Sequence, residues 1–383
     1  MAVLNHFLKP TILVTGATGA IGRAVCRDLV THGYLVLGLV RNDEAKARLP
    51  YAVIPVPGDI RDPGGWEHSI EQADILIHLA LHLPEKPGPK EREDAERDAK
   101  LMAEVLDRIA TLARRHKKLM IHTFGALMYE PDPDGWVRET SELSRGRGFG
   151  IRHRAVYPVF QQHRTRGLRA MSVNPAFVYG RGGWFESGVV RPMSRGESFV
   201  IGDGSQTMHY IEASDAASGY RLAIEKGIPG EDYLLADDRP STLAEFTSLV
   251  AKEMGAPHPV SIPEEELIPK LGAWTVEAFT YCPKVDSTKA REQLGWLPRY
   301  RTIQEGVPAV VRAFRRAGLP LPPDVASALN RLGRHYIPAR YPDAHPSGQP
   351  GQHYGEADAV DAFQDAANIL GWVDGQWEAL RGA

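Results

Sequence analysis

The sequence predicts an α/β protein with a doubly wound parallel sheet, a smaller C-terminal lobe and a helical tail. From about residue 10 to 183, short β-branched apolar runs alternate with segments of helical periodicity, as in parallel sheets covered by helices. Beyond 183 the rhythm becomes irregular, and a proline-rich joint follows at 319–324. We therefore predict a main domain over 1–320, with its core at about 10–183 and its smaller lobe mostly at 184–318. A tail over 321–383 follows.

The strands and helices of the core are predicted from local patterns. The first strand ends in glycine, and the helix after it carries Ile21, Val25 and Leu29 on one face before Gly33 stops it. A second long amphipathic segment follows a charged stretch. The predicted strands are 11–16, 34–41, 52–59, 73–81, 118–125 and 168–180, and the predicted helices are 21–32 and 92–114.

Composition narrows the class of protein. The 383 residues carry a net charge of −3, which favours neither nucleic acid nor an anionic membrane as a partner. The two cysteines, Cys26 and Cys282, form neither a disulfide framework nor a zinc motif, and the histidines show no metal-ligand spacing. No apolar run reaches the length of a membrane span. We expect a cytoplasmic protein with no metal, membrane segment or nucleic-acid partner.

A glycine-rich turn joins the first predicted strand to the first helix. It runs Thr15-Gly-Ala-Thr-Gly-Ala-Ile-Gly22. In this context glycines allow a tight turn, close approach to a pyrophosphate and close helix packing, while the helix N-terminus receives the negative charge. The sequence thus predicts a Rossmann fold that binds a dinucleotide. The binding residues in the turn would be Gly16, Thr18, Gly19, Ala20, Ile21 and Gly22.

The end of the second strand bears on which dinucleotide binds. NAD sites place a carboxylate there, but this chain has Val40 followed by Arg41. An arginine can pair with the 2′-phosphate of NADP. NADP is therefore the favoured cofactor, and NAD is the alternative if Arg41 is only a solvated charge at the strand end.

Motifs spread over residues 10–318 resemble the extended short-chain dehydrogenase/reductase family, which includes NAD-dependent nucleotide-sugar epimerases and dehydratases. The similar segments are the glycine turn, Gly58–Asp62, Ile77–Ala80, Asn174–Gly180, Ile201–Gly204, Asp286–Ala290 and Leu294–Pro298. The resemblance implies that Asp59 and Ile60 flank the adenine and that Leu79, Ala80 and Leu81 line the cofactor groove. It also implies Pro175 at the cofactor and Asn174 at the substrate.

The chain departs from that family at the catalytic positions, which makes it atypical. Members carry a Ser or Thr after the fifth strand and a Tyr-x-x-x-Lys pair on the next long helix, where the phenol exchanges a proton. Here Gly125 takes the hydroxyl position, Phe149 replaces the tyrosine and His153 replaces the lysine. We predict His153, Tyr129 and Thr123 as catalytic candidates. Tyr157, His122 and His209 are further ones.

The substrate side also departs from the nucleotide-sugar enzymes. Met208 occupies the place of their phosphate-binding arginine, and a thioether cannot pair with a phosphate. Aromatic residues near this point, Trp184 among them, fit an apolar pocket or the core of the smaller lobe. We predict a small, non-nucleotide carbonyl or hydroxyl compound as substrate, with Asn174, Trp184 and Met208 at its site.

The tail resembles the late part of HEPN domains, in the segments 334–344 and 354–359. Arg340 and His345 repeat the Arg-x4-His spacing of RNA-cleaving HEPN domains, although so short a motif does not predict nuclease activity. In the last helix Val360, Phe363, Ala367 and Leu370 share a face. Because half a domain cannot bury its own core, we expect the tail to dock on the main body or on a second subunit in a homodimer.

Three functional hypotheses fit these observations. The first is an enzyme that uses NADP(H) without the standard Tyr/Lys pair. The second is a lyase or isomerase that uses the same pocket without net redox chemistry, and the third is a non-catalytic sensor of the dinucleotide.

Overall fold

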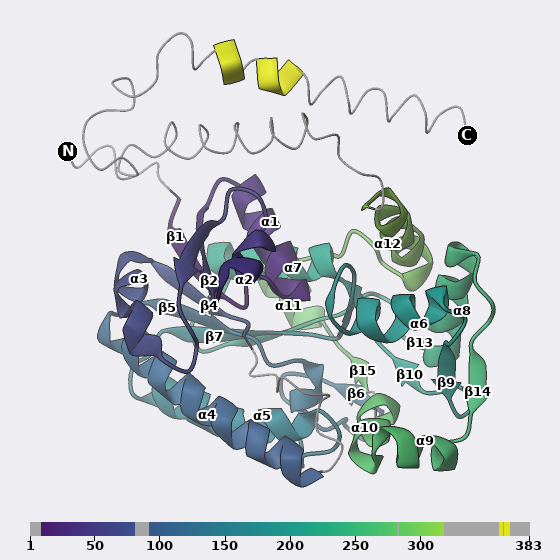
Figure 1. Cartoon of the computed structure of the whole chain (residues 1–383). Helices are drawn as coiled ribbons and strands as arrows, with labels where there is room; N and C mark the ends of the chain where they lie inside the picture. The colour runs from purple at the N-terminus through teal and green to yellow at the C-terminus, as the bar shows by residue number, and fades with distance from the viewer. Residues whose placement is uncertain (1–8, 81–91, 282, 318–359, 363, 368–383) are drawn as a thin grey trace. The chain divides into compact units, whose positions relative to one another are not determined.

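The computed structural model describes residues 9–80, 92–281, 283–317, 360–362 and 364–367 (Figure 1). A seven-stranded parallel sheet lies at the centre of the main body, in the order β3-β2-β1-β4-β5-β7-β12. The strands are β1 Thr11–Thr15, β2 Leu35–Val40, β3 Ile54–Pro57, β4 Ile75–His78, β5 Leu119–His122, β7 Ala170–Pro175 and β12 Asp232–Leu235. The predicted doubly wound fold is confirmed, and the first six strands lie within their predicted ranges.

Helices cover both faces of the sheet, and the pleat of β1 shows why. Ile12 and Val14 point into one apolar cluster, while Leu13 points into the other. The Ile12 face is covered by α1 Ala20–Thr31, α7 Ala213–Lys226 and α11 Thr288–Leu294. The Leu13 face is covered by α3 Glu67–Gln72, α4 Arg92–Arg115 and α5 Gly150–Thr165, with α4 packed along α5 (Figure 1).

The seventh strand was not predicted from the sequence. β12 follows Gly230 and pairs with β7, with Asp232 opposite Ser172. It has four residues and begins with a carboxylate, so it lacks the apolar run on which the other predictions rested. β12 and α7 therefore belong to the central sheet and to its helix layer, although both lie in the 184–318 segment.

Short elements make up the smaller lobe and the connections, in agreement with the irregular rhythm beyond 183. Its strands form two-stranded pairs, β8 with β11, β9 with β14, β10 with β13 and β6 with β15. The strands are β6 Trp136–Val137, β8 Phe177–Tyr179, β9 Phe199–Ile201, β10 Thr207–Met208, β11 Tyr210–Glu212, β13 Ser241–Thr242, β14 Val260–Ile262 and β15 Lys284–Val285. The helical segments are α2 Asp43–Ala47, η2 Pro63–Trp66, η3 Ala126–Met128, η4 Phe185–Val190, α6 Arg191–Ser194, α8 Leu243–Met254, α9 Glu264–Leu271 and α10 Ala273–Thr280.

The chain divides into two compact units, with the division inside α12 Ile303–Ala317, between Ala313 and Phe314. In the second unit, residues 360–362 and 364–367 are helical, and they include Val360 and Ala367. The predicted joint at 319–324, the helix near 325–333, Arg340, His345, Phe363 and Leu370 lie outside the described residues. Among the helices that the structure describes, none is long and apolar enough to span a membrane.

Candidate functional site

The turn between β1 and α1 requires glycine for steric reasons. Gly16 has a φ of +73°, and a Cβ there would lie 2.8 Å from the backbone nitrogen of Ala80. A Cβ on Gly22 would lie 2.0 Å from the carbonyl oxygen of Gly16. Helix α1 begins without a side-chain cap and without an acidic residue in its first turn. The N-terminus of α1, with its partial positive charge, is therefore free of side-chain caps, and the glycines let a pyrophosphate approach its backbone N–H groups closely.

A groove of about 430 Å³ runs over this turn at the carboxyl ends of the first strands. It is lined by eleven residues that were predicted to bind the cofactor: Gly16, Thr18, Gly19, Ala20, Ile21, Gly22, Arg41, Asp59, Ile60, Leu79 and Ala80. Leu81 lies outside the described residues. Ligands of doubly wound folds bind at this edge of the sheet, where the strand order reverses between β1 and β4.

Three arginines line the groove. Arg41, Arg48 and Arg61 all line it, and Arg61 pairs with Asp59 at 2.7 Å, which holds the pKa of that carboxyl below its usual range. Sequence reasoning missed Arg48, which lies at the end of α2, seven residues beyond Arg41. Asn42 cannot serve as a ribose ligand without leaving its present role, because its side chain accepts the Ala45 N–H at 2.8 Å and caps α2.

A second cavity of about 360 Å³ adjoins the groove. The two share Ile21, Leu79, Val178 and Trp184, so Trp184 stands at their junction. Apolar and aromatic residues dominate its wall, in which the side chains able to form hydrogen bonds are Thr123, Arg152, His153, Trp184 and His209. This is the form of a binding site for a small apolar molecule with a few polar groups.

The three positions that depart from the family pattern all line this cavity. Gly125 has a φ of +139°, and a Cβ there would lie 3.4 Å from Nε2 of His153. Phe149 packs edge-on against Trp274 and Phe279, with ring centroids 5.5 and 5.6 Å away. The structure thus brings His153 close to Gly125, the position at which the sequence comparison predicts the family's catalytic hydroxyl.

His153 is neutral at physiological pH. Burial, with the nearby charge of Arg152, lowers its pKa to about 3. Within the described part of the chain, neither ring nitrogen has a hydrogen-bond partner. Its imidazole is therefore available to a ligand in the cavity as a neutral hydrogen-bonding group.

Two other polar residues of the wall are fixed by protein contacts. The Thr123 hydroxyl is hydrogen-bonded to the Tyr220 hydroxyl at 2.7 Å. Nδ1 of His209 accepts the backbone N–H of Val285 at 2.8 Å, and burial lowers the pKa of His209 to about 4. A neutral imidazole that accepts at Nδ1 carries its proton on Nε2, so His209 is a hydrogen-bond donor.

Three predicted site residues line neither the groove nor the cavity. Tyr129 is 2% exposed in the core, and its hydroxyl has no partner among the described residues. Burial raises its pKa further above the usual value for tyrosine. Met208 is buried with its sulfur 3.3 Å from the Tyr210 hydroxyl, and Asn174 is buried within the sheet. The structure thus places these three side chains in the interior rather than in the wall of either space.

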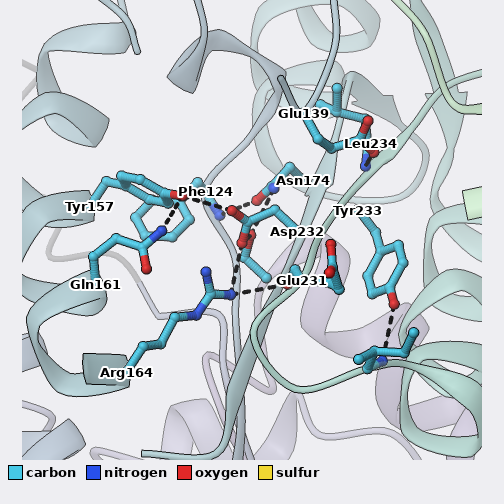
Figure 2. A network of polar contacts seen from close by, with 12 residues as sticks. Phe124, Glu139, Tyr157, Gln161, Arg164, Asn174, Glu231, Asp232, Tyr233 and Leu234 are labelled. Atoms are coloured by element: carbon cyan, nitrogen blue, oxygen red, sulfur yellow. Dashed lines mark hydrogen bonds and ion pairs between the residues drawn. The ribbon is translucent and has the colours of Figure 1, made fainter. Parts of the chain in front are cut away.

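Asn174 instead belongs to a buried polar network (Figure 2). Asp232 accepts hydrogen bonds from Tyr157 (2.7 Å) and Arg164 (2.8 Å) of α5 and from Ser172 (2.6 Å) of β7. Ser172 in turn accepts from Asn174, whose Oδ1 accepts the backbone N–H of Phe124 at 3.3 Å. The network links the edge strand β12 to the loop that carries Phe124 and Gly125, so it holds one wall of the cavity.

His122, a further candidate, also lies outside this cavity. It is buried at the end of β5, where its ring stacks on His78 at 5.1 Å. Burial lowers the pKa of both histidines, that of His78 to about 4.

A parallel doubly wound sheet, a glycine turn at its switch point and an adjoining apolar cavity define a dinucleotide-binding α/β enzyme. Residues 12–236 match the model of the NAD dependent epimerase/dehydratase family, and the chain belongs to this family. It is therefore an NAD(P)-binding enzyme of the oxidoreductase or epimerase/dehydratase type. A model of the HEPN domain matches residues 304–376, so the tail resemblance is confirmed and begins earlier in the chain than 321.

Individual relatives span different activities. The chain is 25% identical to a 2-alkyl-3-oxoalkanoate reductase of Stenotrophomonas maltophilia, over 64% of this chain and 76% of that protein. It is 26% identical to a UDP-glucose 4-epimerase of Mycolicibacterium smegmatis, over 79% of this chain and 98% of that protein. The crystal structure of human epimerase family protein SDR39U1 with NADPH has the same fold, with a TM-score of 0.63 and 18% identity over 79% of this chain and 99% of that one.

Proposed function

We propose that the chain is an NADP(H)-dependent oxidoreductase that acts on a small, non-nucleotide carbonyl or hydroxyl compound without the family's Tyr/Lys pair. The observation that carries this proposal is the apolar cavity beside the dinucleotide groove, with Gly125, Phe149 and His153 in its wall. The name of the Stenotrophomonas reductase, which denotes an oxo compound and no nucleotide, supports a carbonyl substrate without a nucleotide.

The preference for NADP rests on charge. Arg41, Arg48 and Arg61 line the groove, and Arg61 is paired with Asp59. Asp43 and Glu44 lie in the first turn of α2, where their carboxylates interact favourably with the positive end of the helix dipole. Neither residue lines the groove. A 2′-phosphate would meet Arg41 and Arg48, neither of which forms an ion pair with a described carboxylate that lines the groove.

Hydride transfer at a carbonyl carbon needs a hydride and a proton, and bound NADPH supplies the hydride. The chain's residues then manage the oxygen. Nε2–H of His209 can donate a hydrogen bond to it as negative charge develops, and the neutral imidazole of His153 can hold it from the Gly125 side. The proton that completes the hydroxyl group comes from solvent through the His153 ring. Oxidation of an alcohol reverses each of these changes.

An assay of hydride transfer to a panel of small ketones and aldehydes tests the proposal. The reaction is monitored by the loss of NADPH absorbance. We expect turnover with some members, and we expect His153→Ala to lower it at least about a hundredfold, a typical effect of removing a proton-transfer group. His68→Ala is the matched control, because its side chain is 77% exposed on α3. No transfer with any member would contradict the oxidoreductase proposal. Unchanged turnover and pH profile in His153→Ala would contradict the role of His153.

A further inference from the structure

One arginine that lines the cavity, Arg152, has no ion-pair partner among the residues that the structure describes. Arg152 lies in the first turn of α5, next to His153, and is 9% exposed. Its Nε is buried without a hydrogen-bond partner, and within the described residues its side chain forms no ion pair. Breaking a buried ion pair by removing one partner is strongly unfavourable because it leaves such a charge uncompensated.

The groups around Arg152 do not neutralise it. Among the described residues, Asp98 of α4 is the carboxylate whose charge acts on Arg152, yet the two form no ion pair within 4 Å. Glu277 of α10 is engaged elsewhere, with Arg147 at 3.7 Å and the Gly148 N–H at 3.3 Å. The rings of Phe149 and Trp274 lie 5.9 Å from the guanidinium carbon, at the outer limit of a cation–π contact.

The local backbone adds to the positive potential. Arg152 lies at the N-terminal end of a 16-residue helix, and no acidic residue occupies the first turn of that helix. His153 beside it is neutral, as is His209 across the wall. An anion that enters the cavity would therefore meet one positive charge in a wall whose other described side chains are uncharged.

We propose that Arg152 binds the carboxylate of the substrate, so that the site takes small organic acids with an apolar body and a carbonyl or hydroxyl group. This inference rests on the proposed function and specifies its substrate class. A planar carboxylate matches the fork of a guanidinium, whereas the aromatic wall suits an alkyl or aryl body. Because Arg152 and His153 both line the cavity, a carboxylate on Arg152 would place a nearby oxygen-bearing carbon within the same cavity as His153.

The test compares 3-hydroxy acids of four to ten carbons, and 3-hydroxy-3-phenylpropanoate, with their methyl esters, by calorimetry on the full chain saturated with NADP. We expect at least one acid to bind tenfold or more tightly than its ester. Arg152→Gln should abolish that preference and Arg152→Lys should retain part of it. Arg154→Gln is the matched control, since Arg154 is an exposed arginine on the same helix.

Folding of the variants is checked by thermal unfolding without ligand. Arg152→Gln removes an uncompensated charge, so it should be as stable as the parent or more stable, whereas a structural role predicts a loss. If every ester binds as well as its acid, or phenyl phosphate binds more tightly than every acid, the proposal is wrong. NADP affinity is measured separately, and the acid titrations are repeated without the cofactor. A lack of NADP binding would contradict the proposed function, while acid binding to the chain alone would still report on Arg152.

Discussion

Loss of the Asp232 carboxylate should destabilise the polar network that holds one wall of the cavity. Its side chain and that of Arg164 are 10% and 7% exposed, and they form an ion pair at 2.8 Å. Replacing Asp232 by Asn keeps the shape but removes the charge. The guanidinium would keep its hydrogen bond to the carbonyl oxygen of Glu231 at 3.0 Å and could donate to the new amide oxygen, but it would lose its counter-charge, and its Nε and Nη1 have no hydrogen-bond partner even in the parent. We expect a loss of about 3 kcal/mol in the free energy of unfolding, the lower end for a broken buried pair, since the amide can still accept hydrogen bonds.

Urea unfolding of the parent, Asp232→Asn, Arg164→Met and the double variant measures this effect. The double variant should lose less than the sum of the single ones, because it leaves no unpaired charge. Glu142→Gln serves as the control, as Glu142 pairs with Arg145 on the surface with both side chains more than three-quarters exposed, and should change stability by under about 1 kcal/mol. A loss in Asp232→Asn no larger than that of the control would refute the reasoning.

Three further predictions concern the turn, the pH dependence and the substrate. Gly22→Ala should weaken NADPH binding at least tenfold in calorimetry, because its Cβ would overlap the Gly16 carbonyl, whereas Gly188→Ala, which has open space around it, should not. As the pH is lowered through about 5.5, the free energy of unfolding measured in urea titrations should fall by about 2 kcal/mol per pH unit. At this pH four histidines whose pKa is lowered in the folded protein take up protons on unfolding: His78, His122, His153 and His209. This uptake exceeds the protons that Glu139 and Asp237 release, since burial raises their pKa values to about 7 and about 8. A rise in stability toward pH 5 would show that assignment to be wrong. UDP-glucose and dTDP-glucose should not raise the unfolding temperature in a saturable way. A strong shift with either would contradict the prediction of a non-nucleotide substrate.

The sequence was sufficient where a feature depends on local sterics. The glycine turn is such a case, because the φ of Gly16 and the close contact of Gly22 arise within one strand–turn–helix unit. The spacing from Phe149 to His153 likewise placed both residues on the cavity side of α5.

Features that depend on distant strands could not be predicted in the same way. Asp232 lies in a four-residue strand without an apolar run, and its role depends on pairing with β7. Tyr129 and Met208 follow their motifs at plausible positions, but packing turns both side chains into the core. Arg152 is unremarkable in sequence, and only the absence of a described partner in the fold distinguishes it.

Calorimetric titration of the full chain with NADPH and with NADH tests the central claim most directly. The arginines at the groove predict that NADPH binds at least tenfold more tightly, which corresponds to about 1.4 kcal/mol, and that Arg41→Ala narrows this difference. Equal affinities, or tighter binding of NADH, would contradict the NADP assignment, and no binding of either would contradict the dinucleotide site itself.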